Sequence, residues 1–194
     1  MEMVKRIAKA GVNLVALAIM FPFAALSGFG RVAMLFQLFA QMVALVPGLP
    51  GDYLRVCYYA MTVTKCPLSS RISFGSVFAQ SAVTIERAVY IGAYCVIAKC
   101  HIGERTQIAS HVQIFGGGWQ HARGEDGRIL PADERAFTAI TIGKDCWLGA
   151  SAIVMADVGS GTTIGAGAVV THPIPPNVVA AGIPARVIKE LHHD

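Results

Sequence analysis

IGKDCW-LGASAI-VMAD-VGSGTT-IGAGAV, residues 142–169, is the stretch of this chain that decides its fold. It is a row of six-residue units, one of them shortened, and each unit opens on Ile, Leu or Val. Glycine follows in four of the five units, and the fifth residue of every full unit is small or compact. These fifth residues are Cys146, Ala152, Thr162 and Ala168. One unit can bury its aliphatic side chain only against another copy, so the units must stack into a continuous core.

The same pattern occurs upstream, between residues 72 and 113. Its clear copies are ISFGSV from Ile72, FAQSAV from Phe78, IERAVY from Ile85, IGAYCV from Ile91, IGERTQ from Ile102 and IASHVQ from Ile108. We interpret the glycine at the second position as a tight corner that needs a positive φ and a close approach of the backbone. Three units would make one triangular turn, so the pattern predicts an all-β fold, a parallel β-helix over residues 72–190.

The pattern is interrupted by residues 115–139. This segment has no repeat units and contains three consecutive glycines, Trp119, His121 and most of the local charge. A long loop that leaves a regular scaffold is a common position for binding and catalytic residues. We therefore expect function to centre on loop 115–139.

The composition, with 54% hydrophobic and 14% charged residues among 194, is apolar for a soluble protein. The length suits one domain plus an appendage, and the apolar excess predicts a surface that faces lipid or a partner. A net charge of +4, scattered along the chain, does not indicate nucleic-acid binding. The cysteines lack metal-ligand spacing, and their odd number favours reduced thiols in the cytosol. They are Cys57, Cys66, Cys95, Cys100 and Cys146.

Two apolar runs, residues 12–30 and 32–46, precede the repeats and are separated by Arg31. Basic residues flank the pair: Lys5, Arg6 and Lys9 before it, and Arg55, Lys65 and Arg71 after it. Positive charge on both flanks is typical of a helical hairpin that enters the membrane from the cytosolic face, either re-entrant or shallow. We therefore predict membrane association through residues 12–46, in which Arg31 must pair or reach the interface. A cleaved signal peptide and a bundle of helices buried at an oligomer interface are the alternatives.

The sequence PGLPG, residues 47–51, marks a break in regular structure. After it, we expect Asp52 to cap an amphipathic helix over residues 52–66 that lies on the membrane or packs against the first coil. The predicted organisation is a helical membrane-association region (1–71), a repeat domain (72–190) and a short tail (191–194).

The repeat units, the interrupting loop and the ending PPNVVAAGIPARVIKE, residues 175–190, resemble the hexapeptide-repeat acyltransferases. The ending is especially similar to that of galactoside and maltose O-acetyltransferases. The resemblance covers residues 72–190. It implies a left-handed parallel β-helix, a homotrimer, and transfer of an acetyl group from acetyl-CoA to a hydroxyl without a metal.

The apolar leader and the junction PGLPGDYLR, residues 47–55, resemble a narrower group, the membrane-associated polysaccharide acetyltransferases of the colanic-acid type. This resemblance implies a glycan or lipid-linked sugar as the acceptor. It also implies a catalytic domain on the cytoplasmic side of the bacterial inner membrane.

A sugar hydroxyl is a weak nucleophile at neutral pH, so a base must take its proton as it attacks the thioester. Histidine suits this role, and the resemblance implies a loop histidine five residues after the aliphatic residue that opens a unit. Counting from Ile114, that place is Trp119. We assign the base to His121, two residues later, with His111 as the second candidate; another base, or an inactive protein, stays open. Acidic candidates to orient the base or contact the substrate are Glu125, Asp126, Asp133 and Glu134.

The resemblance also implies where acetyl-CoA binds. The small residues that match the family's backbone contacts are Ala150, Ala166 and Thr171. His172, also a predicted acetyl-CoA contact, stands where the family usually has lysine, which weakens one charge contact. Arg186 matches a basic residue that meets the CoA phosphates, and Lys189 is placed to help because an ammonium group pairs well with phosphate.

Three other functional classes compete with this interpretation. An antibiotic-modifying acetyltransferase of the same fold would gain nothing from the apolar leader. A metal enzyme like the γ-type carbonic anhydrases would need three converging histidines, two of them five residues apart, whereas His101, His111 and His121 are each ten apart. A non-catalytic trimeric scaffold is favoured by Trp119 at the place expected for the base.

Overall fold

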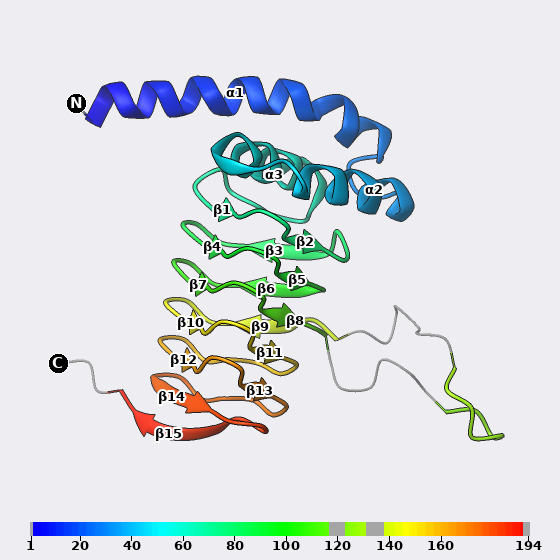
Figure 1. The fold of residues 1–194 in the computed structure, drawn as a ribbon, viewed down its shortest axis with the longest axis vertical. Coiled ribbons are helices and arrows are strands. Elements are labelled where there is room, and N and C mark those ends of the chain that lie inside the picture. Colours follow the sequence, from blue (N-terminus) through cyan, green and yellow to red (C-terminus); the bar gives the residue numbers. More distant parts are fainter. Residues whose placement is uncertain (1, 117–122, 131–137, 192–194) are drawn as a thin grey trace.

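The computed structural model describes residues 2–116, 123–130 and 138–191. It consists of a stack of β-coils with helices at one end and an antiparallel strand at the other (Figure 1). The helices are α1 (Glu2–Leu26), α2 (Ala33–Ala44) and α3 (Gly48–Thr62). The predicted parallel β-helix of hexapeptide repeats, preceded by an apolar helical segment, is confirmed.

Three sheets form the sides of a triangular prism, because each coil contributes one short strand to each sheet. The seven-stranded sheet contains β1 (Arg71–Ile72), β4 (Tyr90–Ile91), β7 (Gln107–Ile108), β10 (Trp147–Leu148), β12 (Thr163–Ile164), β14 (Val178–Ala181) and β15 (Arg186–Glu190). The five-stranded sheet contains β2 (Val77–Phe78), β5 (Val96–Ile97), β8 (Gln113–Ile114), β11 (Ile153–Val154) and β13 (Val169–Val170). The three-stranded sheet contains β3 (Val83–Ile85), β6 (Cys100–Ile102) and β9 (Ile140–Ile142).

The register of the coils places the predicted aliphatic positions directly above one another. Ile91 pairs with Ile108, Ile108 with Leu148, and Leu148 with Ile164, all in parallel. These side chains are fully or almost fully buried, as are the small fifth-position residues such as Ala152. The core is therefore the inside of the prism, as the repeat pattern predicts.

The second-position glycines serve one of the two purposes expected of them. A Cβ on Gly149 would lie 2.5 Å from the Ala166 nitrogen in the next coil, so glycine is needed for the close approach of the backbones. Its φ, however, lies outside the left-handed region, which is the part of the interpretation that was wrong. The positive φ falls two residues later, at the fourth position, on residues such as Tyr94, His111 and Ser151. The tight bend of each corner is thus made by the fourth residue.

The prism has three edges, each named here for its residues. The small-residue corner joins the seven- and five-stranded sheets and consists of residues 92–95, 109–112, 149–152 and 165–168. The charged corner joins the three- and seven-stranded sheets and consists of residues 86–89, 103–106, 143–146 and 159–162. The loop corner joins the five- and three-stranded sheets and consists of residues 79–82, 98–99, 115–139, 155–157 and 171–173.

The helices form a cap on the first coil. Helix α3 packs between α1 and β1, and α2 packs against β2, so the two apolar runs do not pair with each other as a simple hairpin (Figure 1). Helix α3 begins at Gly48, inside the predicted break, and its N-cap is Pro47. The expectation that Asp52 caps this helix was therefore wrong. The first contact of the solenoid also precedes β1, since Lys65 forms a parallel bridge with Thr84.

A buried arginine joins the cap to the solenoid. The Arg55 side chain is fully buried; its Nε donates to the Ile72 carbonyl at 2.8 Å, and its Nη1 to the Val46 carbonyl at 2.8 Å. Its Nη2 donates to the Asp52 carboxylate at 2.6 Å, and Asp52 also accepts from Arg71 at 2.7 Å. Burial lowers the pKa of Arg55, and the hydrogen bond that Arg55 donates to Asp52 opposes that shift. Asp52 is thus the counter-ion of this junction.

We predict that Arg55→Met destabilises the protein by about 3 to 5 kcal/mol, because it leaves buried carbonyl groups without a donor and Asp52 without its buried partner. The matched control is Arg87→Met, which breaks an exposed pair with Glu104 at 3.2 Å and should cost less than about 1 kcal/mol. Urea unfolding in detergent, followed by circular dichroism, measures both losses. Equal losses in the two variants would contradict this role for Arg55.

Candidate active site

The small-residue corner carries two of the predicted contacts for acetyl-CoA. Ala150 and Ala166 occupy equivalent places in consecutive coils, and the Gly167 N–H donates to the Ala150 carbonyl at 2.8 Å. Both alanines are exposed. The register extends this column upward through Ser110 and Ala93, because Ile108 pairs with Leu148 and Ile91 with Ile108. The corner is therefore a strip of accessible backbone along the solenoid axis.

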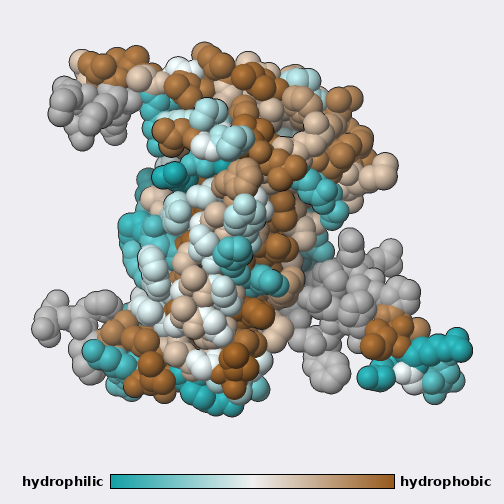
Figure 2. Space-filling model, in the orientation of Figure 1, coloured by the Kyte–Doolittle hydropathy of each residue, from teal (hydrophilic) through white to brown (hydrophobic). Residues whose placement is uncertain are grey.

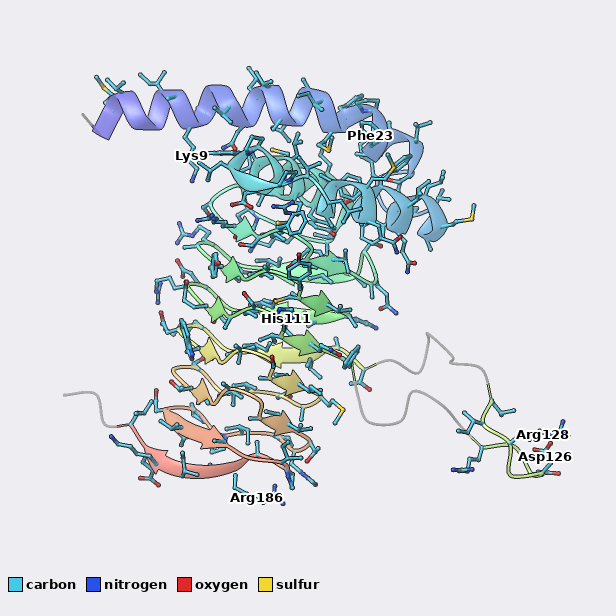
Figure 3. All side chains as sticks on the ribbon, viewed as in Figure 1. Lys9, Phe23, His111, Asp126, Arg128 and Arg186 are labelled. Carbon is cyan, nitrogen blue, oxygen red and sulfur yellow. The ribbon has the colours of Figure 1, made fainter. Side chains whose placement is uncertain are left out.

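Arg186 lies at the lower end of this strip. Strand β15 turns back antiparallel to β14, which places Arg186 opposite Ala181, in the coil below Ala166. Its Nη1 donates to the Ala185 carbonyl at 2.9 Å and its side chain is exposed (Figure 3). Lys189 lies further along β15, opposite Val179, and is exposed too. The structure thus aligns Ala150, Ala166 and Arg186 on one edge.

Thr171 and His172 lie on a different edge, the loop corner. Both are exposed, and the Thr171 Oγ1 and His172 Nδ1 atoms are 2.9 Å apart. Strand β13 separates them from Ala166, a distance of up to about 17 Å along the extended chain. Within one chain, the predicted acetyl-CoA contacts therefore fall into two groups, at the two edges of the five-stranded sheet.

The loop that carries the predicted base leaves the solenoid at the loop corner. His121 and Trp119 lie outside the described residues, as do Asp133, Glu134 and the tail histidines. The two roots of the loop are close together, since a Cβ on Gly116 would collide with the Thr138 carbonyl. The loop therefore starts and ends at one place on the coil, between Lys99 above and Met155 below.

The described tip of the loop, residues 123–130, is a tight turn that projects away from the solenoid (Figures 1 and 3). The Gly124 N–H donates to the Arg128 carbonyl at 2.9 Å, and Arg123 and Ile129 form an antiparallel bridge. Asp126 accepts from the Arg128 N–H at 3.1 Å and pairs with its guanidinium at 3.3 Å. Glu125 and Asp126 are exposed there, away from Ala150, Ala166 and Thr171 of the same chain.

His111, the second candidate for the base, lies on the small-residue corner. Its φ is 62°, and its ring stacks on Tyr94 with centroids 5.3 Å apart. It is exposed and lies on a different edge from the loop roots (Figure 3). His101 lies on a third surface, in β6 of the three-stranded sheet. Among the described residues, no group of His, Cys, Asp and Glu side chains is arranged to hold a metal.

Comparison with known proteins finds similar acyltransferases. A family profile described as the hexapeptide repeat of succinyl-transferase matches residues 139–172. The Escherichia coli K12 protein WbbJ, named for O-acetyl transfer in lipopolysaccharide biosynthesis, is 34% identical over 62% of this chain and 63% of its own length. The galactoside O-acetyltransferase of the same organism is 51% identical over 27% of each chain. Over these segments the chain is similar to hexapeptide-repeat acyltransferases.

Two solved structures share the fold of this chain. A maltose O-acetyltransferase from Clostridium difficile 630 matches 84% of this chain and 90% of its own, with a TM-score of 0.55 and 22% identity. AntD, an N-acyltransferase from Bacillus cereus in complex with dTDP and 3-hydroxybutyryl-CoA, matches 63% of this chain and 70% of its own, with a TM-score of 0.52 and 20% identity. The chain spans less than two thirds of the length of WbbJ.

The thiols of this chain are not placed for nucleophilic chemistry. All five cysteines are free and buried. Burial raises the pKa of Cys57 to about 11 and the pKa values of Cys66 and Cys100 to about 12. Because the thiolate is the reactive form, these groups are inert at neutral pH. An acyl-enzyme on one of these three sulfurs is therefore disfavoured.

One feature of the structure was missed in the sequence. A cleft with a volume of about 720 Å³ lies where the α1–α2 turn meets the loop corner, and Arg31 and Lys99 are among its lining residues. The one signal in the sequence was an isolated charge between two apolar runs. That signal could not reveal the cleft, because Lys99 and the turn are brought together only by the fold.

Proposed function

We propose that this protein transfers an acetyl group from acetyl-CoA to a sugar hydroxyl of a glycan or lipid-linked glycan precursor at the cytoplasmic face of the membrane. The observation that carries the proposal is the exposed strip of small residues that ends at Arg186. A thioester cofactor with a long flexible arm and phosphates at its far end needs such a strip, with backbone groups along the arm and cations at the end. The AntD complex with an acyl-CoA supports the same class of donor.

The two groups of acetyl-CoA contacts favour a trimer. Ala150 and Ala166 lie on one edge and Thr171 and His172 on another, so a second copy is needed to bring both groups to one cofactor. If the small-residue corner of one copy meets the loop corner of the next, the contact is heterologous and closes after three copies of a triangular prism. The loop tip, which projects away from its own coil, would then reach a neighbour.

In this arrangement, His121 acts as the general base. It takes the proton of the acceptor hydroxyl while that oxygen forms a bond to the thioester carbonyl carbon. The tetrahedral intermediate places negative charge on the former carbonyl oxygen, which backbone N–H groups of the coil stabilise. Its collapse breaks the carbon–sulfur bond, and the proton on His121 passes to the CoA thiolate. The products are the acetyl ester and CoA.

His121→Ala should lower acetyl transfer at least about 100-fold, because removal of a general base typically costs 10²- to 10⁴-fold. The measurement is CoA thiol release with a polysaccharide precursor as the acceptor, and acetyl-CoA affinity should stay the same. His111→Ala is the matched comparison, since His111 is the second candidate for the base and its ring is exposed. Full activity in His121→Ala together with loss in His111→Ala would transfer the role to His111. A wild-type protein that binds acetyl-CoA but never transfers acetyl would favour the scaffold.

Arg186→Ala should raise the KM for acetyl-CoA about 10-fold with little change in kcat, because a phosphate contact remote from the reacting carbon affects binding of ground and transition states equally. The control is Lys144→Ala, which removes an exposed cation that lies on the charged corner instead. This variant should leave the KM for acetyl-CoA unchanged. Steady-state kinetics with varied acetyl-CoA distinguish the two. An unchanged KM in Arg186→Ala would argue against the phosphate contact.

Helix α1 supports the membrane part of the proposal because both of its faces are apolar. Ala16 and Met20 face α3 and are buried, whereas Leu14 is 70% exposed and Val15 is 60% exposed on the outer face. Hydrophobic residues therefore cover the end of the molecule formed by α1 and α2 (Figure 2). Among the described residues, the segment Ile7–Leu26 is long and apolar enough to cross a membrane, with 17% of it buried. Since α1 lies along α3, we propose that it lies in the membrane interface rather than across it.

Replacing Leu14, Val15 and Ile19 by Gln should reduce binding to anionic lipid vesicles at least about 10-fold, because it removes the outer apolar face. The control replaces Ile183 and Ile188, which are 76% and 66% exposed at the opposite end of the solenoid, by Gln. Co-sedimentation with vesicles measures both. Undiminished sedimentation of the α1 variant would contradict this mode of attachment.

A further inference from the structure

The cleft between the helical cap and the solenoid has no role in the proposed reaction so far. It has a volume of about 720 Å³, within the usual range for ligand sites. Its walls come from the α1–α2 turn, α2, the end of α3 and the loop corners of the first two coils. The lining residues that matter here are Phe29, Arg31, Gln37, Thr64, Ser81 and Lys99.

The walls of this cleft are held in place on both sides. Gln37 donates from Nε2 to the Ala79 carbonyl at 2.9 Å, which ties α2 to the loop corner. The Thr64 N–H donates to the Ser81 carbonyl at 3.1 Å, which ties the end of α3 to the same corner. At the turn, Gly30 has a φ of 86°, and a Cβ there would collide with the Thr62 carbonyl. The cleft is therefore a fixed part of the fold.

The chemistry of the lining suits a phosphate group. The charged side chains among the described lining residues are both basic, Arg31 and Lys99, and hydroxyl and amide groups accompany them. Guanidinium and ammonium groups pair strongly with phosphate oxygens. Arg31 is also flanked by Phe29 and Val32, which are 45% and 44% exposed. The cationic cleft thus opens beside an apolar rim that continues onto α1 and α2.

The cleft lies on the same edge of the prism as the predicted catalytic loop. Lys99 belongs to the loop corner, and a Cβ on Gly116, at the root of the loop, would lie 3.6 Å from the Lys99 carbonyl oxygen. Thr171 and His172 lie on this edge too, two coils below Gly116 and on the side away from the helices. A molecule held in the cleft would therefore lie on the helix-cap side of the loop roots at Gly116 and Thr138.

We propose that this cleft binds the phosphate of a lipid-linked sugar acceptor, with Arg31 and Lys99 as its cationic contacts and the lipid chain running over Phe29 and Val32 onto α2. The inference rests on the proposed function and names the acceptor's class. A phosphate alone would use the two cations, whereas a lipid phosphate would also use the apolar rim. The apolar surface beside Arg31 is what favours the lipid.

Direct binding tests this inference without requiring acetyl transfer. The full chain in non-ionic detergent is titrated with geranylgeranyl phosphate, with geranylgeraniol and with inorganic phosphate. Isothermal titration calorimetry measures the affinity for each compound. We expect the lipid phosphate to bind at least about 10-fold more tightly than either the alcohol or inorganic phosphate. Arg31→Gln and Lys99→Gln should each weaken its binding about 10-fold. Arg87→Gln, an exposed cation on the charged corner, should not.

The other outcomes overturn the inference. If geranylgeraniol binds as tightly as geranylgeranyl phosphate, the cations have no role in binding. If inorganic phosphate binds as tightly as geranylgeranyl phosphate, the ligand is a free phosphate and the apolar rim has no role. Unchanged affinity in Arg31→Gln and Lys99→Gln, with circular dichroism like that of the unmodified chain, would place the phosphate elsewhere. If the lipid phosphate binds as expected but no acetyl transfer occurs, the proposed enzymatic function fails while the binding site stands. If acetyl transfer occurs and the lipid phosphate does not bind, only this inference fails.

Discussion

Stacking of one coil on the next is the constraint on which the rest of the structure depends. A single coil holds about three inward aliphatic side chains and has no second layer to bury them against, so every coil relies on its neighbours. The two ends of the stack must then be covered by something else. At one end, α2 and α3 provide that cover, with the Tyr59 ring 4.1 Å from Phe78 between centroids and Arg55 donating to backbone carbonyls of both parts. At the other end, β15 pairs antiparallel to β14.

The same constraint leaves the edges of the prism free to differ. Only the first and fifth residues of a unit point inward, so the residues between them determine what each corner presents. One corner carries small residues, one carries ion pairs such as Arg105 with Asp145 at 2.7 Å, and one carries the long loop. The ion pairs are exposed and contribute little stability individually. In the proposed function, the chemistry is placed at the small-residue and loop corners, while the core stays uniform.

In the proposed function, the helical cap connects this scaffold to a membrane. Helix α1 presents one apolar face to α3 and another outward, which a helix at the surface of a water-soluble protein would not do. Because the cap also forms one wall of the cationic cleft, attachment to a membrane and capture of an acceptor would use the same part of the molecule. In the proposed function, a lipid-linked acceptor would meet the cleft, the catalytic loop and the acetyl-CoA strip in sequence along the prism.

The repeat units, by themselves, determined the parallel β-helix, its buried positions and the place where the loop interrupts it, because each unit carries its own burial pattern and needs only another copy beside it. They also indicated Ala150, Ala166 and Arg186 through their place in the repeat and the ending. Tertiary structure alone decided where those residues lie. It aligned these three on the small-residue corner and placed Thr171 and His172 on the loop corner. It also decided that Asp52 is a counter-ion rather than a helix cap, and that Arg31 and Lys99 line the same cleft. These relations join segments far apart in the chain, and a local pattern carries no information about which distant segment will lie beside it.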